Sequence, residues 1–93
     1  MKRRILRTNT FVRSAKHAIK KHPDATGDLR EALHLLAEDA FNPKLRTHKL
    51  KGKLMGFWAC SAGIDLRIVF EFVEDEGSEA ILLETIGTHD EVY

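Results

Sequence analysis

Two stripes of apolar residues at helical spacing run through the first half of the chain. The first stripe follows residues 8–10, which favour helix N-caps, and stops at Pro23, which breaks a helix. The second begins after Asp24 or Thr26, either of which can cap it, and ends at Asn42-Pro43. The stripe residues are Phe11, Val12, Ala15, Ala18 and Ile19, then Leu29, Ala32, Leu33, Leu36 and Ala40. The short connection between the stripes predicts an antiparallel helix hairpin.

After Pro43 the apolar residues alternate, which is typical of strands. The clearest case is residues 66–73, where Leu66, Ile68 and Phe70 line one face. Strands are expected at residues 45–50, 57–61, 66–73 and 80–86, with turns at residues 51–53 and 62–65 and a polar loop at residues 74–78. These short connections favour an antiparallel meander of four strands.

Residues 2–7 add a short N-terminal strand, in which only Ile5 and Leu6 are apolar. The order of strand, helix hairpin and sheet predicts one α+β domain, residues 1–93, with the hairpin packed on one face of the sheet. A chain of 93 residues with 43% hydrophobic content can fill one core, but it has no room for a separate cofactor domain.

Composition excludes several classes of protein. No run of eighteen apolar residues is present, so no membrane helix is expected, and no apolar stretch follows the basic residues 1–7 to make a secretory signal. Cys60 has no second cysteine to pair with, which indicates a reducing cytoplasm. Without a cysteine pair or two histidines four apart on a helix, we expect no metal site. No phosphate-binding glycine loop or dinucleotide fingerprint predicts a cofactor.

Charge is divided unevenly along the chain. Residues 1–53 hold fourteen lysines and arginines against five acidic residues, whereas residues 54–93 hold one against nine. The basic half is suited to binding phosphates. The alternative is that the two halves neutralise each other across the fold.

The first candidate for chemistry is His89, which directly follows the last expected strand. A histidine at a sheet edge is partly exposed and can exchange protons near neutral pH. The alternative is an ordinary polar tail.

The second candidate is His48, which shares the strand at residues 45–50 with Arg46 and stands next to a lysine cluster. The cluster consists of Lys49, Lys51 and Lys53. Basic residues of this kind either discourage pairing at an exposed strand edge or bind phosphates, with His48 as proton carrier.

Arg67 is the only basic residue of the second half and lies in the middle of the clearest strand. An unpaired guanidinium is costly there, so either Glu71 or Glu84 pairs with it, or it stabilises a phosphate-derived anion. Tyr93 and Phe57 are candidates for stacking on bases.

RNA cleavage without a metal needs a base for the 2′-hydroxyl, a cation for the pentavalent phosphate and an acid for the leaving 5′-oxygen. A histidine, an arginine and a few lysines can supply these groups, and the sequence contains no Ser-His-Asp signature that would indicate other chemistry.

Several motifs together resemble the RelE/ParE superfamily of bacterial toxins, and most closely its YafQ-like branch. They are His48-Lys49-Leu50-Lys51-Gly52, Gly56-Phe57-Trp58, Asp65-Leu66-Arg67-Ile68-Val69-Phe70 and Ile86-Gly87-Thr88-His89-Asp90-Glu91-Val92-Tyr93. The resemblance covers nearly the whole chain, and its most specific part is the Gly-Thr-His ending.

This resemblance implies the toxin of a type II toxin–antitoxin pair, which enters the ribosomal A site and cleaves mRNA there without a metal. The family motifs fall on His89 and His48 as acid and base in an order left open, on Asp65, on Arg67 as transition-state stabiliser, and on Tyr93 for base stacking. Arg46, Phe57, Lys51 and Lys53 are further expected substrate contacts. The implied partners are the ribosome, mRNA and an antitoxin whose flexible segment folds over the basic groove, with operator DNA bound only through the antitoxin complex.

The sequence departs from the family at Ser61, where close YafQ-like toxins often carry another histidine. The alternative functions are a ParE-type inhibitor of DNA gyrase, which does not cut RNA, and an inactive module that only binds an antitoxin. Because the same fold serves all of these, the fold does not decide between them. The residue pattern that favours the nuclease is His89 beside a terminal aromatic.

Overall fold

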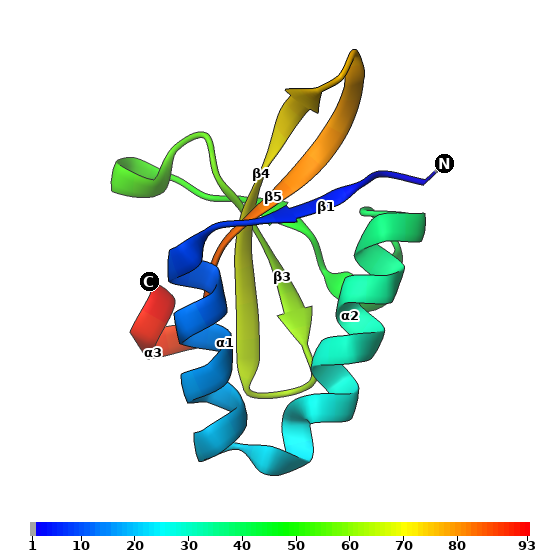
Figure 1. Cartoon of the computed structure of the whole chain (residues 1–93). Helices are drawn as coiled ribbons and strands as arrows, with labels where there is room; N and C mark the ends of the chain where they lie inside the picture. The colour runs from blue at the N-terminus through cyan, green and yellow to red at the C-terminus, as the bar shows by residue number, and fades with distance from the viewer. Residues whose placement is uncertain (1) are drawn as a thin grey trace.

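Two long helices cover one face of a five-stranded sheet (Figure 1). The structure is a computed structural model that describes residues 2–93. Its strands are β1 (Ile5–Arg7), β2 (His48–Lys49), β3 (Trp58–Ala62), β4 (Leu66–Asp75) and β5 (Ser78–Thr88). Its helices are α1 (Asn9–Lys21), α2 (Thr26–Glu38) and the single turn α3 (His89–Val92), with 3₁₀ turns η1 (Pro23–Ala25), η2 (Pro43–Leu45) and η3 (Gly52–Leu54). The predicted α+β class is confirmed.

The sheet has the strand order β1-β5-β4-β3-β2. Strands β2 to β5 form the predicted antiparallel meander, and β1 joins β5 in parallel, with Ile5 opposite Ile81. Helices α1 and α2 run in opposite directions on either side of η1, as the predicted hairpin requires (Figure 1). Helix α1 packs mainly against β5 and α2 against β3, so the two helices cover different parts of the same face.

Thr8 joins the start of α1 to the sheet. Its hydroxyl oxygen accepts the backbone N–H of Phe11 at 3.0 Å, which caps the helix, and its hydroxyl donates to the carbonyl of Leu83 on β5 at 3.0 Å. At the other end Pro23 stops the helical ladder and begins η1.

The prediction of a strand over residues 45–50 is wrong for most of its length, since β2 holds only His48–Lys49. Pro43 begins a 3₁₀ turn, in which the side-chain oxygen of Asn42 accepts the N–H of Lys44 at 3.0 Å. Arg46 then ends the turn in the left-handed region, with φ 52°. Local hydrogen bonding and turn geometry therefore replace the first part of the strand.

The predicted polar loop at residues 74–78 is also wrong, because β4 and β5 continue to a two-residue turn. Glu76 and Gly77 form that turn with φ of 50° and 80°, the positive values that a tight hairpin turn of matching twist requires. At its other end β5 runs on to Thr88, two residues past the predicted limit.

The two faces of the sheet differ in character. On the face covered by α1 and α2, the β4 residues Leu66, Ile68 and Phe70 are fully buried in the main core. We call the opposite face the open face. Cross-strand register places two rows of residues on it, listed as His48–Ala59–Val69–Thr85 and Ser61–Arg67–Gly87. No helix of the hairpin covers these rows, although Ala59, Val69 and Gly87 are themselves buried. Among residues 2–93, no helix is both long and apolar enough to cross a membrane.

Part of the charge division is neutralised within the fold. Arg3 pairs with Glu79 at 2.8 Å, and Arg4 pairs with Asp75 at 2.9 Å and with Glu76 at 2.5 Å, which ties the N-terminal strand to the acidic β4–β5 hairpin. Within residues 2–93, no such ion pair is found for the basic segment from Lys44 to Lys53. Neutralisation within the fold therefore accounts for part of the charge division, and phosphate binding by the segment from Lys44 to Lys53 stays a prediction.

Candidate active site

The C-terminal tail folds back over the end of the sheet. The carboxylate of Glu91 accepts the backbone N–H of Thr88 at 2.8 Å, which caps the single turn α3. That hydrogen bond is the main reason that the pKa of Glu91 is lowered. The turn packs so closely on Gly87 that a Cβ there would lie 3.0 Å from the Glu91 Cβ and 3.2 Å from Val92 Cγ1. Glycine at this position therefore allows the tail to return toward the open face.

Tyr93 lies between the two candidate histidines. Its hydroxyl is 3.5 Å from His48 Nε2, and its ring meets the ring of His89 edge-on, with 4.6 Å between the ring centroids. Its side chain is 44% exposed, so one surface remains open to a ligand. Three residues from β2, α3 and the C-terminal end thus form one cluster, although 45 positions separate His48 from Tyr93.

His48 is held in one orientation by the backbone of Arg46. The Nδ1 atom of His48 lies 2.9 Å from the Arg46 carbonyl, which can only accept a hydrogen bond, so Nδ1 carries the proton. In the neutral ring Nε2 is then the unprotonated nitrogen, and it faces Tyr93. The left-handed backbone of Arg46 aims that carbonyl at a cost of about 1–3 kcal/mol, a type of strain often found at functional sites.

Arg67 lies half-buried on the open face, in the row beside His48. Its guanidinium donates to the backbone carbonyls of Ile64 at 3.1 Å and Leu66 at 2.9 Å. Burial raises the pKa of the Tyr93 hydroxyl, and the positive charge of Arg67 opposes this rise. Arg67 is also opposite Gly87 in the strand register, and the tail packs on Gly87, so Arg67 lies next to the tail on the open face.

The alternative pairing of Arg67 with Glu71 or Glu84 is not observed, because those two carboxyl groups interact with each other. The hydrogen bond from Glu71 is the main cause that raises the pKa of Glu84 from 4.5 to about 7, followed by burial and by repulsion from Glu71. Below about pH 7 the two carboxyl groups on the open face therefore share one proton.

This pair gives the fold a testable pH dependence. Because the folded pKa of Glu84 exceeds its unfolded value, its contribution to stability is present below about pH 4.5 and is lost as the pH rises through about 7. Glu84→Gln keeps a hydrogen-bond donor without the charge, so we expect it to stabilise the protein at about pH 8 by about 1 kcal/mol, after allowance for solvent screening. The gain should vanish at about pH 4.

Urea unfolding at a series of pH values would measure this effect. Glu74→Gln is a matched control, because Glu74 is an exposed carboxylate of the same sheet, on β4 next to β5. Equal stability changes in both variants at every pH would contradict the shared proton.

The remaining expected site residues lie at different distances from this cluster. Lys51 and Lys53 are exposed at η3, and Phe57 is half-buried just before β3. Asp65 lies in the exposed β3–β4 turn and lines a separate cavity of about 320 Å³ with Lys21 and Asp24. The structure therefore brings His48, His89, Tyr93 and Arg67 together, and leaves Asp65 to one side.

Two features of the site are absent from the sequence analysis. The pattern Thr88-His89-Asp90-Glu91 matches a capping box, which indicates the turn α3, but no helix was predicted there. The left-handed conformation of Arg46 has no sequence signal, since such positions favour glycine or asparagine. Burial raises the pKa of Cys60 to about 12, and the residue is a small apolar part of the core.

Comparison with known proteins identifies the family. The model of a family described as the bacterial toxin of type II toxin–antitoxin system, YafQ, matches residues 3–93. A crystal structure of YafQ from E. coli strain BL21(DE3) is 19% identical over 98% of each chain, with a TM-score of 0.80. The E. coli DinJ–YafQ toxin–antitoxin complex is 20% identical, over 100% of this chain and 99% of that chain, with a TM-score of 0.77.

A metal-bound toxin from Helicobacter pylori is 28% identical over the whole of both chains, with a TM-score of 0.75. A search of curated protein sequences found no match. The family model covers nearly the whole chain, and the fold of the chain agrees with that of the solved structures. The protein therefore belongs to the YafQ family of toxins of type II toxin–antitoxin systems.

Proposed function

We propose that this toxin is a ribosome-dependent endoribonuclease that cleaves mRNA with two histidines and inhibits translation. The observation that carries the proposal is the cluster in which His48 and His89 both contact Tyr93, with Arg67 beside them on the open face. Two groups that can exchange protons, an aromatic surface and a cation are the set that cleavage through the 2′-hydroxyl needs.

In this mechanism His48 is the base. Its Nε2 atom is the unprotonated nitrogen of the neutral ring, because Nδ1 is engaged with the Arg46 carbonyl. It takes the proton of a 2′-hydroxyl, whose oxygen then attacks the adjacent phosphorus. The bond from phosphorus to the 5′-oxygen breaks, which leaves a 2′,3′-cyclic phosphate on one fragment.

His89 is the acid that protonates the leaving 5′-oxygen. Its side chain is 69% exposed, and Nδ1 lies 3.5 Å from the carboxylate of Asp90, a contact that becomes an ion pair when the ring is protonated. Arg67 stabilises the charge on the pentavalent phosphate, and Tyr93 stacks on a base and fixes its position between the two histidines. Asp65 lines a separate cavity in the β3–β4 turn, so no step of this mechanism is assigned to it.

The partners in this proposal are the ribosome, where the mRNA is presented in the A site, and a cognate antitoxin. The E. coli relative is found in a complex with DinJ. We expect an antitoxin here to cover the basic segment from Lys44 to Lys53 with an acidic chain, and operator DNA to be bound through that complex.

The test is to add the purified protein to a reconstituted translation reaction with a defined mRNA and to map the new 5′ ends. We expect cuts within the translated region that require ribosomes. Intact mRNA together with inhibition of DNA gyrase in a supercoiling assay would replace this proposal with the ParE-type function. Intact mRNA without inhibition would favour a module that only binds an antitoxin.

A further inference from the structure

We infer that a cationic cavity beside His48 is a second phosphate subsite, which holds the RNA phosphate next to the one that is cleaved. This inference rests on the proposed function. The cavity measures about 400 Å³, and it is lined by Lys44, Arg46, Ser61, Gly63, Ile64 and Arg67. We call it the η2 cavity, after the turn that supplies Lys44.

The η2 cavity adjoins the catalytic cluster on two sides. Arg46 is one of its lining residues, and the backbone carbonyl of Arg46 holds His48 Nδ1 at 2.9 Å. Arg67 forms another wall, and its positive charge also opposes the rise in the pKa of the Tyr93 hydroxyl. A strand of RNA whose cleaved phosphate lies at the histidines therefore reaches this cavity with a neighbouring phosphate.

The cations of the cavity have no acidic partner within the fold. Among residues 2–93, no carboxylate lies within ion-pair distance of Lys44, Arg46 or Arg67, whereas Arg3 and Arg4 each have one. Three positive side chains around one concavity repel each other, and an anion relieves that repulsion. The hydroxyl of the half-buried Ser61 adds a neutral donor to the same wall.

The conformation of Arg46 supports a role for its side chain independently of the charge pattern. Its φ of 52° and ψ of 40° lie in the left-handed region, which glycine adopts without steric cost. Glycine at this position would aim the same carbonyl at His48. An arginine in a glycine conformation at the wall of the cavity therefore indicates that its side chain has a function.

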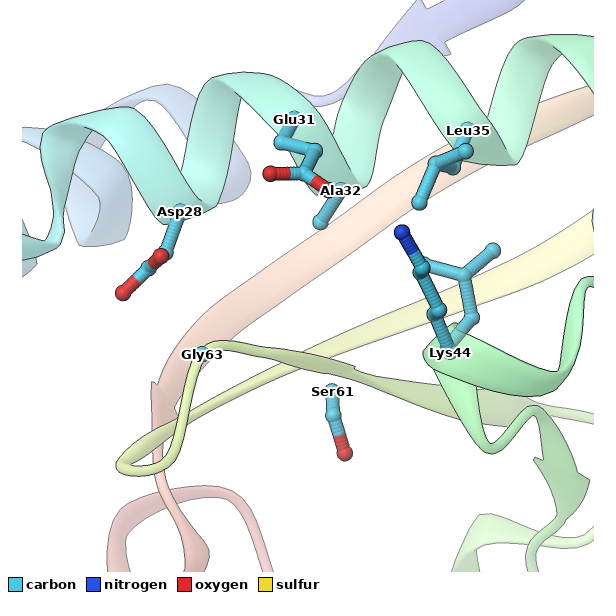
Figure 2. A pocket seen from close by; sticks show the side chains of 8 residues that line it. Asp28, Glu31, Ala32, Leu35, Lys44, Ser61 and Gly63 are labelled. Atoms are coloured by element: carbon cyan, nitrogen blue, oxygen red, sulfur yellow. The ribbon is translucent and has the colours of Figure 1, made fainter.

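The neighbouring surface limits the ligand to one phosphate. A second cavity of about 170 Å³ shares Lys44, Ser61 and Gly63 with the first and continues to α2. Figure 2 shows Asp28 and Glu31 extending from α2 on one side of it, with Lys44, Ser61 and Gly63 on the other. These carboxylates repel a further phosphate, so the backbone of the RNA must turn away beyond Lys44.

Binding of short RNA to the whole protein tests the subsite. The probe is a fluorescent oligoribonucleotide with a 2′-deoxy group at the cleaved position, titrated by anisotropy at several salt concentrations. We expect Arg46→Gly and Lys44→Gln each to lower the affinity about tenfold and to reduce the slope of log affinity against log salt by about one. Lys16→Gln, which removes one exposed charge from α1, should change neither.

A second probe replaces the phosphate next to the cleaved one by an uncharged methylphosphonate. The wild-type protein should bind it about tenfold more weakly, and Arg46→Gly should bind both probes equally. Thermal unfolding excludes a folding defect, since glycine relieves the strain at this position.

Unchanged affinity and salt slope in both variants would overturn the subsite. If Arg46→Gly and Lys44→Gln bind RNA normally but no longer bind an antitoxin, the subsite is overturned, and the ligand of the cavity is a carboxylate of a partner protein. If wild-type protein binds the probe as described but leaves mRNA uncut in the translation assay, the subsite stands and the nuclease proposal fails.

Discussion

Replacing His89 by alanine is expected to lower the rate of mRNA cleavage at least about 100-fold, the usual scale for a lost general acid or base. The imidazole of His89 meets the Tyr93 ring edge-on, and His89 is the only histidine of α3, the residue type that most often serves as a general acid. Removing it takes little from the core, because the side chain is 69% exposed. Loss of activity should therefore occur without loss of stability.

Single-turnover cleavage of mRNA on purified ribosomes would measure the effect. His34→Ala is the matched control, because His34 is an exposed histidine on α2 and has no part in the cluster. It should keep the wild-type rate and unfolding curve. Cleavage by His89→Ala within a few-fold of the wild-type rate would remove His89 from the mechanism.

His48→Ala distinguishes the two histidines. If His48 is the base and His89 the acid, the rate of the wild-type toxin should have a bell-shaped pH profile, and each variant should lose one limb of it. Because the two groups act in one step, the double variant should be little slower than the slower single variant. Additive losses would show that the two histidines do not act together.

Tertiary contacts explain why the site was only partly predictable. The alternating residues of β4 identify the strand and its two faces, so the position of Arg67 on the open face follows from the sequence. The contact between His48 and Tyr93 does not, because it depends on the register that places His48 opposite Ala59 and on the turn of the tail over Gly87. Family resemblance pointed to these residues, whereas their geometry came from the fold.

The errors in the predicted elements have local causes. Residues 45–50 alternate as a strand does, but the Asn42 cap and Pro43 stabilise a 3₁₀ turn instead. The polar residues at the tip of the β4–β5 hairpin indicated a loop, yet their strand pairing is supported by the ion pairs of Arg3 and Arg4 with that hairpin. A hydrogen bond from the backbone to the Asn42 side chain decided the conformation of the first region, and ion pairs support the strands of the second. Both interactions outweighed the pattern of hydrophobic residues.

Phe70→Ala is expected to destabilise the fold by about 3–5 kcal/mol, the largest effect on stability that we predict. The Phe70 ring is 0% exposed and stands edge-on to Phe72, with 5.4 Å between ring centroids. It lies opposite Leu83 at the irregularity between Val69 and Phe70, in the centre of the sheet. A cavity there cannot close unless β4 moves against β5. Because the tail follows β5 directly, such a movement would also displace the tail.

Urea unfolding followed by the fluorescence of the single tryptophan, Trp58, would measure this loss. Phe41→Ala removes the same atoms from a ring that is 51% exposed, so it should cost about 1 kcal/mol. Since small domains have about 5–15 kcal/mol of stability in total, Phe70→Ala can fall below the limit for accumulation. In that case Phe70→Leu, with an expected loss of about 1–2 kcal/mol, is compared with Phe41→Ala instead. A loss no greater than that of Phe41→Ala would mean that Phe70 is not the centre of the core.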